Sequence, residues 1–377
     1  MTHALRDRAP PLENLTGIRG VAALWVVLYH FQATTLVAST ISLGPVIGGG
    51  ACGVDVFFVL SGLILSITYA PRFATQGFTR RSFGDFLRKR LARIYPTHLL
   101  TFLVMLAAWG LAVQAGVSVH GDVTNDGWSA LCNLLLIHAW GFTRTLSWNA
   151  PSWSVSAEWF AYLVLFPFCV LVMRRLSAAQ SMIAAMLLWL AIVGFVLGTG
   201  ASLELVTTDG IARIAPEFLA GYAIWRCLGT MPRVPGDLYA LLGIAGIAGS
   251  LLLPSPGFAL LLPAVVLLMM GLHRGGVWVD RLFGNRLMVF CGKISYSIYM
   301  MHLFVLIAAN QVLRRVPEAP TALNGRLVLI VEVLIAVVAG YLCYRLIEAP
   351  ARRLLVSGWA RRGGATPVIH SAAPTAG

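Results

Sequence analysis

Charged residues are scarce in this sequence, in which Asp, Glu, Lys and Arg together make up 11% of the 377 residues. A soluble globular domain usually carries about one-quarter charged residues, which cover its water-exposed surface. Hydrophobic residues make up 58% of the chain instead. This composition excludes an ordinary soluble domain and predicts an integral membrane protein.

Acidic residues are the rarer of the two charge signs, with 15 Asp and Glu against 28 Lys and Arg. In a polytopic membrane protein a basic excess marks cytoplasmic loops, so we expect no nucleic-acid partner. Cysteine is also infrequent: the 6 cysteines mostly lie in apolar runs, and none shows the Cys or His spacing of a zinc site. We therefore expect no bound metal. The polar first residues lack the apolar core of a signal peptide.

Long apolar runs are abundant, and they define the predicted fold. A transmembrane helix needs about 20 mostly apolar residues. The segments that meet this need are 15–38, 52–70, 97–116, 153–173, 181–199, 211–228, 238–253, 258–272, 291–312 and 327–347. The apolar segment 128–140 is shorter, and we expect it to be re-entrant or interfacial. The predicted fold class is all-α, a polytopic integral membrane helical bundle with about ten transmembrane helices.

The distribution of basic residues predicts the orientation in the membrane. The connection 71–96 is rich in Arg and Lys, and positive charge favours the cytoplasmic side. If 128–140 does not cross the membrane, both termini and most other basic connections also lie inside. Three arginines between the last two spans are the exception. The predicted organisation is a cytoplasmic segment 1–14, a transmembrane domain 15–353 and a disordered cytoplasmic tail 354–377.

The first predicted span carries two ionisable residues, Arg19 and His30, in the stretch GIRGVAALWVVLYHF. Ionisable residues inside a membrane are costly and are usually functional. Eleven positions correspond to three helical turns plus about 20°, so the two side chains share one face of the helix. Arg19 alone is compatible with a snorkelling arginine at a helix end. A histidine near the middle of the membrane on the same face favours a functional interpretation.

Asp55 enters the second span, in GVDVFFVLSG, without a basic neighbour in the sequence. A buried carboxylate needs a partner. His30 on the preceding, antiparallel helix is a suitable partner, because a carboxylate on one ring nitrogen leaves the other nitrogen basic. The alternative is a residue that stabilises the helix start, since Asp is favoured in a first turn.

Arg90 and Arg93 lie one helical turn apart in FLRKRLARIYP, and they lead into a span from the cytoplasmic side. Two guanidinium groups on one face can grip a phosphorylated ligand. The alternative is a basic helix that flanks the membrane and holds anionic lipid.

Glu158 lies at the start of the fourth predicted span, in PSWSVSAEWF, and follows Trp153, Ser154 and Ser156 in the sequence. A glutamate just inside a span is unusual, although a carboxylate also caps a helix N-terminus and tryptophans gather at membrane interfaces. Weaker signals are the pair Arg213 and Glu217, and His302, which we interpret as a satisfied core histidine.

Taken together, these motifs resemble the membrane-bound acyltransferase family 3. The hallmark of that family is an arginine followed, after ten residues, by a histidine in the first span. GVDVFFVLSG, RKRLARIYP and PSWSVSAEWF resemble its next motifs, and RIAPEFLAGY, ISYSIYMMHLF and IEAPARR resemble later ones. The matches run in order from about residue 15 to 353. One departure is that the aromatic run after the glutamate, EWFAYL, is shorter than is usual in the family. The resemblance leaves no room after 353 for the extracytoplasmic hydrolase-like domain of some members.

The resemblance implies an O-acyltransferase, most often an O-acetyltransferase, in the bacterial cytoplasmic (inner) membrane. The donor would be acetyl-CoA or another acyl-CoA on the cytoplasmic side. The acceptor would be a hydroxyl of a cell-surface or exported glycan, or of a lipid-linked saccharide, with membrane lipid around the protein.

The resemblance also implies a role for each motif. His30 would act as general base or carry the acyl group, with Asp55 orienting it. Arg19 would bind a CoA phosphate or polarise a carbonyl, and Arg90 and Arg93 would hold further CoA phosphates. On the far side of His30 from the CoA phosphates, the acceptor would be engaged by Trp153, Ser154, Ser156 and Glu158.

A proton-coupled transporter is the rival interpretation, with His30, Asp55 and Glu158 as a proton relay. Such transporters are typically built from inverted repeats, and the sequence has none that we detect. A non-enzymatic lipid or polymer exporter is a second rival, and it would not need a grip for CoA phosphates.

Overall fold

The structure is a computed structural model that describes residues 12–34, 44–116, 125–200, 210–315 and 322–363. These residues form helices and turns, and no strand occurs among them. The α-helices are α1 (Leu12–Thr34), α2 (Gly44–Gly48), α3 (Gly53–Gln76), α4 (Arg80–Gln114), α5 (Gly127–Leu134), α6 (Trp153–Phe160), α7 (Phe166–Leu171), α8 (Ala178–Thr199), α9 (Gly210–Cys227), α10 (Gly236–Leu252), α11 (Leu261–Arg274), α12 (Val277–Phe283), α13 (Arg286–Leu313), α14 (Ala322–Cys343) and α15 (Ala349–Gly363).

Shorter helical turns connect or interrupt these helices. The 3-10 turns are η2 (Gly50–Cys52), η3 (Ala150–Ser152), η5 (Met173–Arg175) and η6 (Gly257–Leu260). Two π-helical turns, η4 (Ala161–Leu165) and η7 (Tyr344–Glu348), join α6 to α7 and α14 to α15 without a break.

Each of the predicted spans is helical over most of its described residues, which confirms the all-α membrane bundle. By length and composition, 7 helical segments of the described chain can cross a membrane. They are Gly50–Gln76, Arg80–Gln114, Ala150–Arg175, Ala178–Thr199, Gly257–Arg274, Arg286–Leu313 and Gly325–Ser357. The predicted segments 15–38, 211–228 and 238–253 correspond to α1, α9 and α10. α1 and α9 are more polar because they carry the ionisable residues of interest, and α10 is shorter.

The segment 128–140 does not form a spanning helix. α5 contains 8 residues, about 12 Å of helix against a hydrocarbon thickness of about 30 Å. The Nε2 atom of His98 on α4 bonds to the carbonyl of Asn133 at 2.9 Å. This bond ties the end of α5 to the spanning helix α4.

Two predicted boundaries need correction. The connection 71–96 is not a loop: α3 continues to Gln76, and α4 starts at Arg80 behind a Thr79 capping box. Arginine, lysine and leucine are good helix formers, so the basic stretch continues the span as one helix. At the other end, α15 continues to Gly363, so the predicted disordered tail 354–377 begins inside a helix; residues 364–377 lie outside the described chain.

The helices that surround the site approach one another closely at glycines. A Cβ atom at Gly62 of α3 would lie 2.1 Å from the carbonyl oxygen of Phe218 on α9. A Cβ atom at Gly221 of α9 would lie 2.1 Å from the carbonyl oxygen of Val59. Only glycine permits this contact between α3 and α9.

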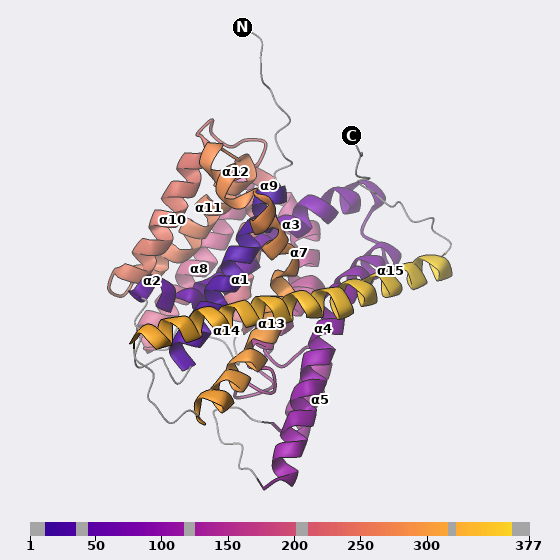
Figure 1. Ribbon diagram of the computed structural model, residues 1–377. Helices are drawn as coiled ribbons and strands as arrows, with labels where there is room; N and C mark the ends of the chain where they lie inside the picture. The colour runs from indigo at the N-terminus through magenta and orange to yellow at the C-terminus, as the bar shows by residue number, and fades with distance from the viewer. Residues whose placement is uncertain (1–11, 35–43, 117–124, 201–209, 316–321, 364–377) are drawn as a thin grey trace, which may run out of the picture.

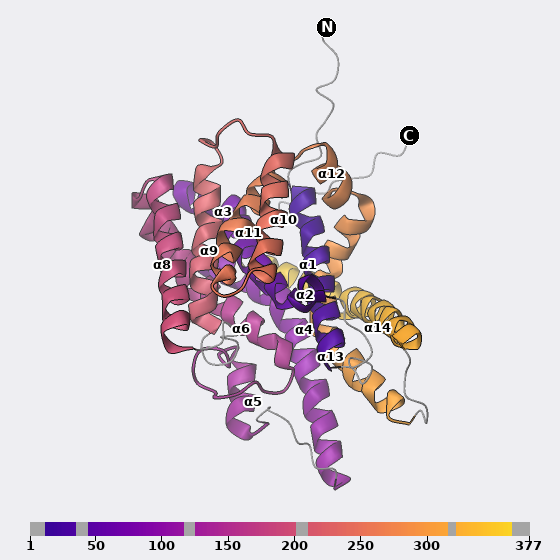
Figure 2. The same cartoon turned by 90° about the vertical axis from the view of Figure 1, so that its left-hand side faces the viewer.

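Figure 1 shows α14 and α15 as one long rod that lies across the bundle and crosses α4. After a quarter turn the same rod is seen nearly end-on, with α8 at the opposite edge of the bundle (Figure 2). α13 lies between α14 and α1 and packs against both. α1, α3, α4, α6 and α13 meet at the centre, where the candidate site lies.

Candidate functional site

A pocket opens between α1, α3, α4, α6 and α13, and it gathers most of the predicted polar residues. Arg19, Arg90, Arg93, Ser154 and Glu158 all line it. Its apolar wall comes largely from α3, and α13 and η4 add hydroxyl groups. The residues of this wall and these hydroxyls include Phe57, Phe58, Ile64, Tyr162, Tyr296 and Tyr299.

The arginines of the pocket make few polar contacts with other described residues. An Nη atom of Arg90 donates to the Tyr69 hydroxyl at 2.9 Å, and the guanidinium lies 5.0 Å from the centre of that ring. The Nε atom of Arg90 is buried and has no hydrogen-bond partner among the described residues. Arg19 and Arg93 make no ion pair within the described chain. Half-buried guanidinium groups that face a pocket without a carboxylate ion pair favour an anionic ligand.

Glu158 supplies the carboxylate of the pocket. It accepts a hydrogen bond from the Ser61 hydroxyl on α3 at 3.0 Å, and it lies close enough to Arg19 for electrostatic attraction. From the sequence we expect Glu158 on the opposite side of His30 from Arg90 and Arg93. This expectation is wrong, because all three side chains line one pocket.

Ser154 and Tyr299 both line the pocket and are joined in a small hydrogen-bond network. The Ser154 hydroxyl donates to the Tyr299 hydroxyl at 2.9 Å, and the Tyr299 hydroxyl donates to the carbonyl of Pro151 at 2.8 Å. This network fixes α6 against α13.

His30 does not line the pocket. Its Nδ1 atom bonds to the carbonyl of Val26 at 2.9 Å, and its ring centre lies 4.9 Å from that of His302. The His302 ring lies 5.7 Å from that of the pocket residue Tyr299. The two histidines therefore form a layer directly behind the pocket wall.

His302, which the sequence suggested is a satisfied core histidine, is in the core but is not fully satisfied. It is completely buried, and its Nε2 atom has no hydrogen-bond partner among the described residues. Its Nδ1 atom bonds to the carbonyl of Tyr299. The sequence signal was the i, i+3 spacing of Tyr299 and His302, which places both on one face of α13.

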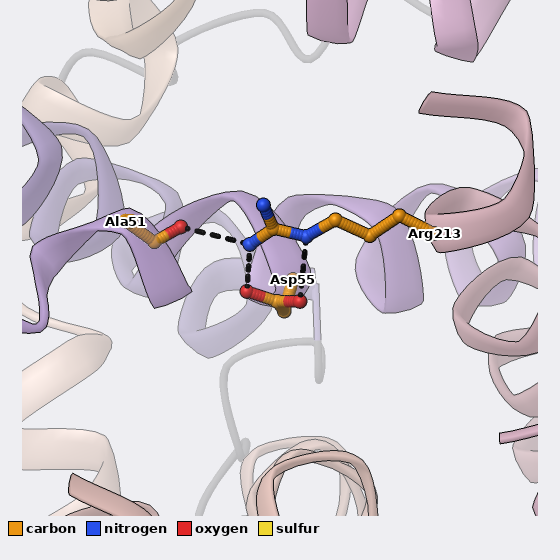
Figure 3. Close-up of polar contacts among 3 residues, drawn as sticks. All are labelled: Ala51, Asp55 and Arg213. Carbon is orange, nitrogen blue, oxygen red and sulfur yellow. Dashed lines mark hydrogen bonds and ion pairs between the residues drawn. The ribbon is translucent and has the colours of Figure 1, made fainter. Parts of the chain in front are cut away.

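Asp55 has a different partner from the one we expected. Its carboxylate accepts two hydrogen bonds from Arg213 on α9, from Nε at 3.1 Å and from Nη2 at 2.6 Å. Figure 3 shows this paired geometry, in which Arg213 also reaches the carbonyl of Ala51 at 3.3 Å. The expected pairing of Asp55 with His30 is therefore wrong. Close packing of α3 on α9 brings Arg213 to the carboxylate instead.

Trp153 and Ser156, both expected at the acceptor, lie outside the pocket lining. The guanidinium of Arg213 lies 5.5 Å from the centre of the Trp153 ring. The buried hydroxyl of Ser156 donates to the carbonyl of Leu136 at 2.8 Å and accepts from the amide of Ala139 at 3.0 Å. Both side chains therefore contact neighbouring parts of the protein and do not face the pocket.

The described residues contain no group of three or more His, Cys, Asp or Glu side chains that is arranged to hold a metal ion.

Comparison with known proteins gives consistent matches along the whole site. A family model described as an acyltransferase domain matches residues 12–345. The acyltransferase MdmB of Streptomyces mycarofaciens is 28% identical over 390 residues, covering 92% of this chain and 93% of that protein. The O-acetyltransferase OatA of Staphylococcus aureus (strain NCTC 8325 / PS 47) is 22% identical over 375 residues, covering 91% of this chain and 57% of that protein. This chain thus spans somewhat more than half of that second relative. No solved structure matches.

Proposed function

The chain belongs to this family of membrane acyltransferases, and we propose that it transfers an acetyl group from acetyl-CoA to a hydroxyl of a saccharide. The observation that carries the proposal is the pocket, in which three arginines and one carboxylate line a cavity of a membrane bundle. The O-acetyltransferase name of one relative supports acetyl as the acyl group. The acceptor class is a cell-surface or exported glycan, or a lipid-linked saccharide.

The arginines would hold the phosphates of the donor. Arginine binds phosphate through two parallel hydrogen bonds, and Arg90 and Arg93 present adjacent forks from one turn of α4. Arg19 lies near Glu158 and would stabilise the negative charge that develops on the thioester carbonyl during transfer.

Two groups are proposed to handle the proton of the acceptor hydroxyl. His30 is the proposed general base, and its Nδ1 contact with Val26 favours a tautomer whose Nε2 is basic. Because His30 lies outside the pocket lining and His302 separates it from Tyr299, these side chains would have to move for His30 to reach an acceptor hydroxyl in the pocket. Glu158 lies in the pocket itself and would orient the acceptor hydroxyl.

The transporter interpretation loses support. A relay through His30, Asp55 and Glu158 requires Asp55 to exchange protons, whereas both of its oxygens are engaged by Arg213. We propose that the protein resides in the bacterial inner membrane with both termini in the cytoplasm, where acyl-CoA is present.

The test is acetyl transfer by the purified protein in lipid nanodiscs. Radiolabelled acetyl-CoA is supplied with saccharide fractions of the cell envelope, and product label and CoA release are measured. We expect His30→Ala to lower turnover by about 10²- to 10⁴-fold and to leave CoA affinity unchanged, because His30 does not line the pocket.

The arginine variants address donor binding separately. Arg90→Ala and Arg93→Ala should weaken CoA binding, and Lys at either position should restore it only partly, because lysine lacks the fork. Arg88→Ala is the matched control on the same helix, since Arg88 is exposed and pairs with Asp85. A fully active His30→Ala protein, or unchanged CoA affinity without Arg90 and Arg93, would overturn these assignments.

A further inference from the structure

The cationic surface of the pocket continues onto the C-terminal rod. α15 packs against α4, and Figure 1 shows where the two helices cross. Arg352 lies on α15 and is exposed. It was not among the residues that the sequence predicted for the site.

Two hydrogen bonds fix the position of this part of the rod beside the pocket. The hydroxyl of the pocket residue Tyr296 on α13 donates to the carbonyl of Ile94 on α4 at 2.6 Å. The hydroxyl of the next residue, Ser297, donates to Glu348 in η7 at 2.6 Å. Glu348 is therefore held at the level of Arg93, which precedes Ile94 on α4.

Arg352 follows Glu348 by one helical turn, so the two side chains lie on neighbouring positions of one face. Glu348 is buried, whereas Arg352 is exposed. Arg352 interacts electrostatically with Arg93, Arg90 and Glu348. Arg352 does not line the pocket, but it lies on the helix that packs against α4 and interacts with two of the arginines that do.

The charges around the pocket do not balance. Four arginines gather there, Arg19, Arg90, Arg93 and Arg352, against the carboxylates Glu158 and Glu348. Like charges at close range repel one another unless an anion lies between them. The buried, unpartnered Nε atom of Arg90 independently points to a missing acceptor.

We propose that Arg352 binds the 3′-phosphate of CoA, so that the docking site for the nucleotide is built between α4 and α15. The inference rests on the proposed function, because it takes CoA as the donor. CoA carries a diphosphate next to its pantetheine arm and a separate phosphate on the ribose. If the arm enters the pocket, the diphosphate meets Arg90 and Arg93, and the ribose phosphate lies farther out, at the exposed arginine.

The test compares CoA with 3′-dephospho-CoA, which lacks only the phosphate in question. Affinities are measured by calorimetry in nanodiscs of zwitterionic lipid. Arg352→Ala should weaken CoA binding about tenfold or more, the effect of losing one hydrogen bond between charged groups. It should leave the affinity for dephospho-CoA unchanged, which also shows that the variant is folded.

The control variant is Arg353→Ala, which removes the neighbouring exposed arginine and should leave both affinities unchanged. Arg90→Ala should weaken both ligands. Equal losses for the two ligands in Arg352→Ala, or no loss for CoA, would overturn the inference while CoA remains the donor. If the original protein binds neither nucleotide, the proposed donor fails as well. If anionic lipid weakens CoA binding and Arg352→Ala only removes that competition, the arginine binds a lipid phosphate, and the inference is wrong.

Discussion

Arg213 reaches Asp55 from a helix that lies 158 residues farther along the chain. The pair is buried, and its two parallel hydrogen bonds satisfy both carboxylate oxygens. Removing one partner of such a pair leaves an uncompensated charge in a low-dielectric interior. We therefore propose that Asp55 holds α3 against α9.

We expect Asp55→Leu to lower the free energy of unfolding by about 3–5 kcal/mol. The double variant Asp55→Leu with Arg213→Met should lose less, because it removes both charges of the pair together. Thermal unfolding of detergent-solubilised protein, with CoA affinity in parallel, measures both. A stable Asp55→Leu protein that binds CoA but has no turnover would instead return Asp55 to the chemistry.

At the residue scale, the sequence predicted which charged side chains line the pocket better than it predicted which residues pair with one another. Arg19, Arg90, Arg93 and Glu158 stood out because ionisable groups are rare within apolar spans, and the pocket unites them. The partner of Asp55 was missed because pairing across distant helices depends on packing. His30 was expected as the partner because it lies on the preceding helix, and that adjacency in the sequence was misleading.

Among the helices, the contact between α3 and α9 decides where Asp55 meets Arg213. Gly62 and Gly221 let the two backbones touch, and either Cβ atom would overlap a carbonyl oxygen of the other helix. Any side chain there forces the helices apart and stretches the ion pair.

Gly62→Ala and Gly221→Ala should each destabilise the protein by about 1–3 kcal/mol or more, the usual cost of overpacking. Gly194→Ala is the control, because Gly194 lies within α8 and a Cβ atom added there would meet no described atom within 4 Å. That control should be neutral or should stabilise by up to about 1 kcal/mol. Melting temperatures compare the three variants, and equal values for all three would contradict the close-contact explanation.

The apolar runs predicted the helices better than they predicted where each helix ends. Hydropathy marks the part of a helix that lies in lipid, and Leu, Arg and Lys then continue the same helix beyond it. This is why α4 contains 35 residues, about 52 Å, although the predicted span was 97–116. The same reasoning explains the extension of α15 through the predicted tail.

For the whole molecule, the proposed orientation places the basic start of α4 in the cytoplasm and the 135–149 turn outside. Lys89 and Arg144 are exposed in these two regions. Ser152, by contrast, is fully buried against His138 and would make a poor reporter of the same turn.

In intact cells of a cysteine-free variant, Arg144→Cys should react with an impermeant thiol reagent, whereas Lys89→Cys should react only after the membrane is opened. The physical basis is the positive-inside rule. Because α5 does not span the membrane, this orientation places most of the basic connections on the cytoplasmic side. Labelling of Lys89→Cys in intact cells, or protection of Arg144→Cys, would reverse the orientation and the proposed entry side of the donor.

The two π-helical turns, η4 and η7, affect how the helices that follow them are rotated about their axes. A π turn accommodates an additional residue within a continuous helix, and one residue corresponds to a rotation of about 100° in the α-helix that follows. Deleting one residue between Ala349 and Ala351, where the helix is already α-helical and cannot absorb the change, would turn Arg352 away from α4, although Arg19, Arg90 and Arg93 would still be present. A deletion of a kind that a surface loop tolerates would therefore disrupt the proposed site by rotating a helix, without removing any arginine of the pocket.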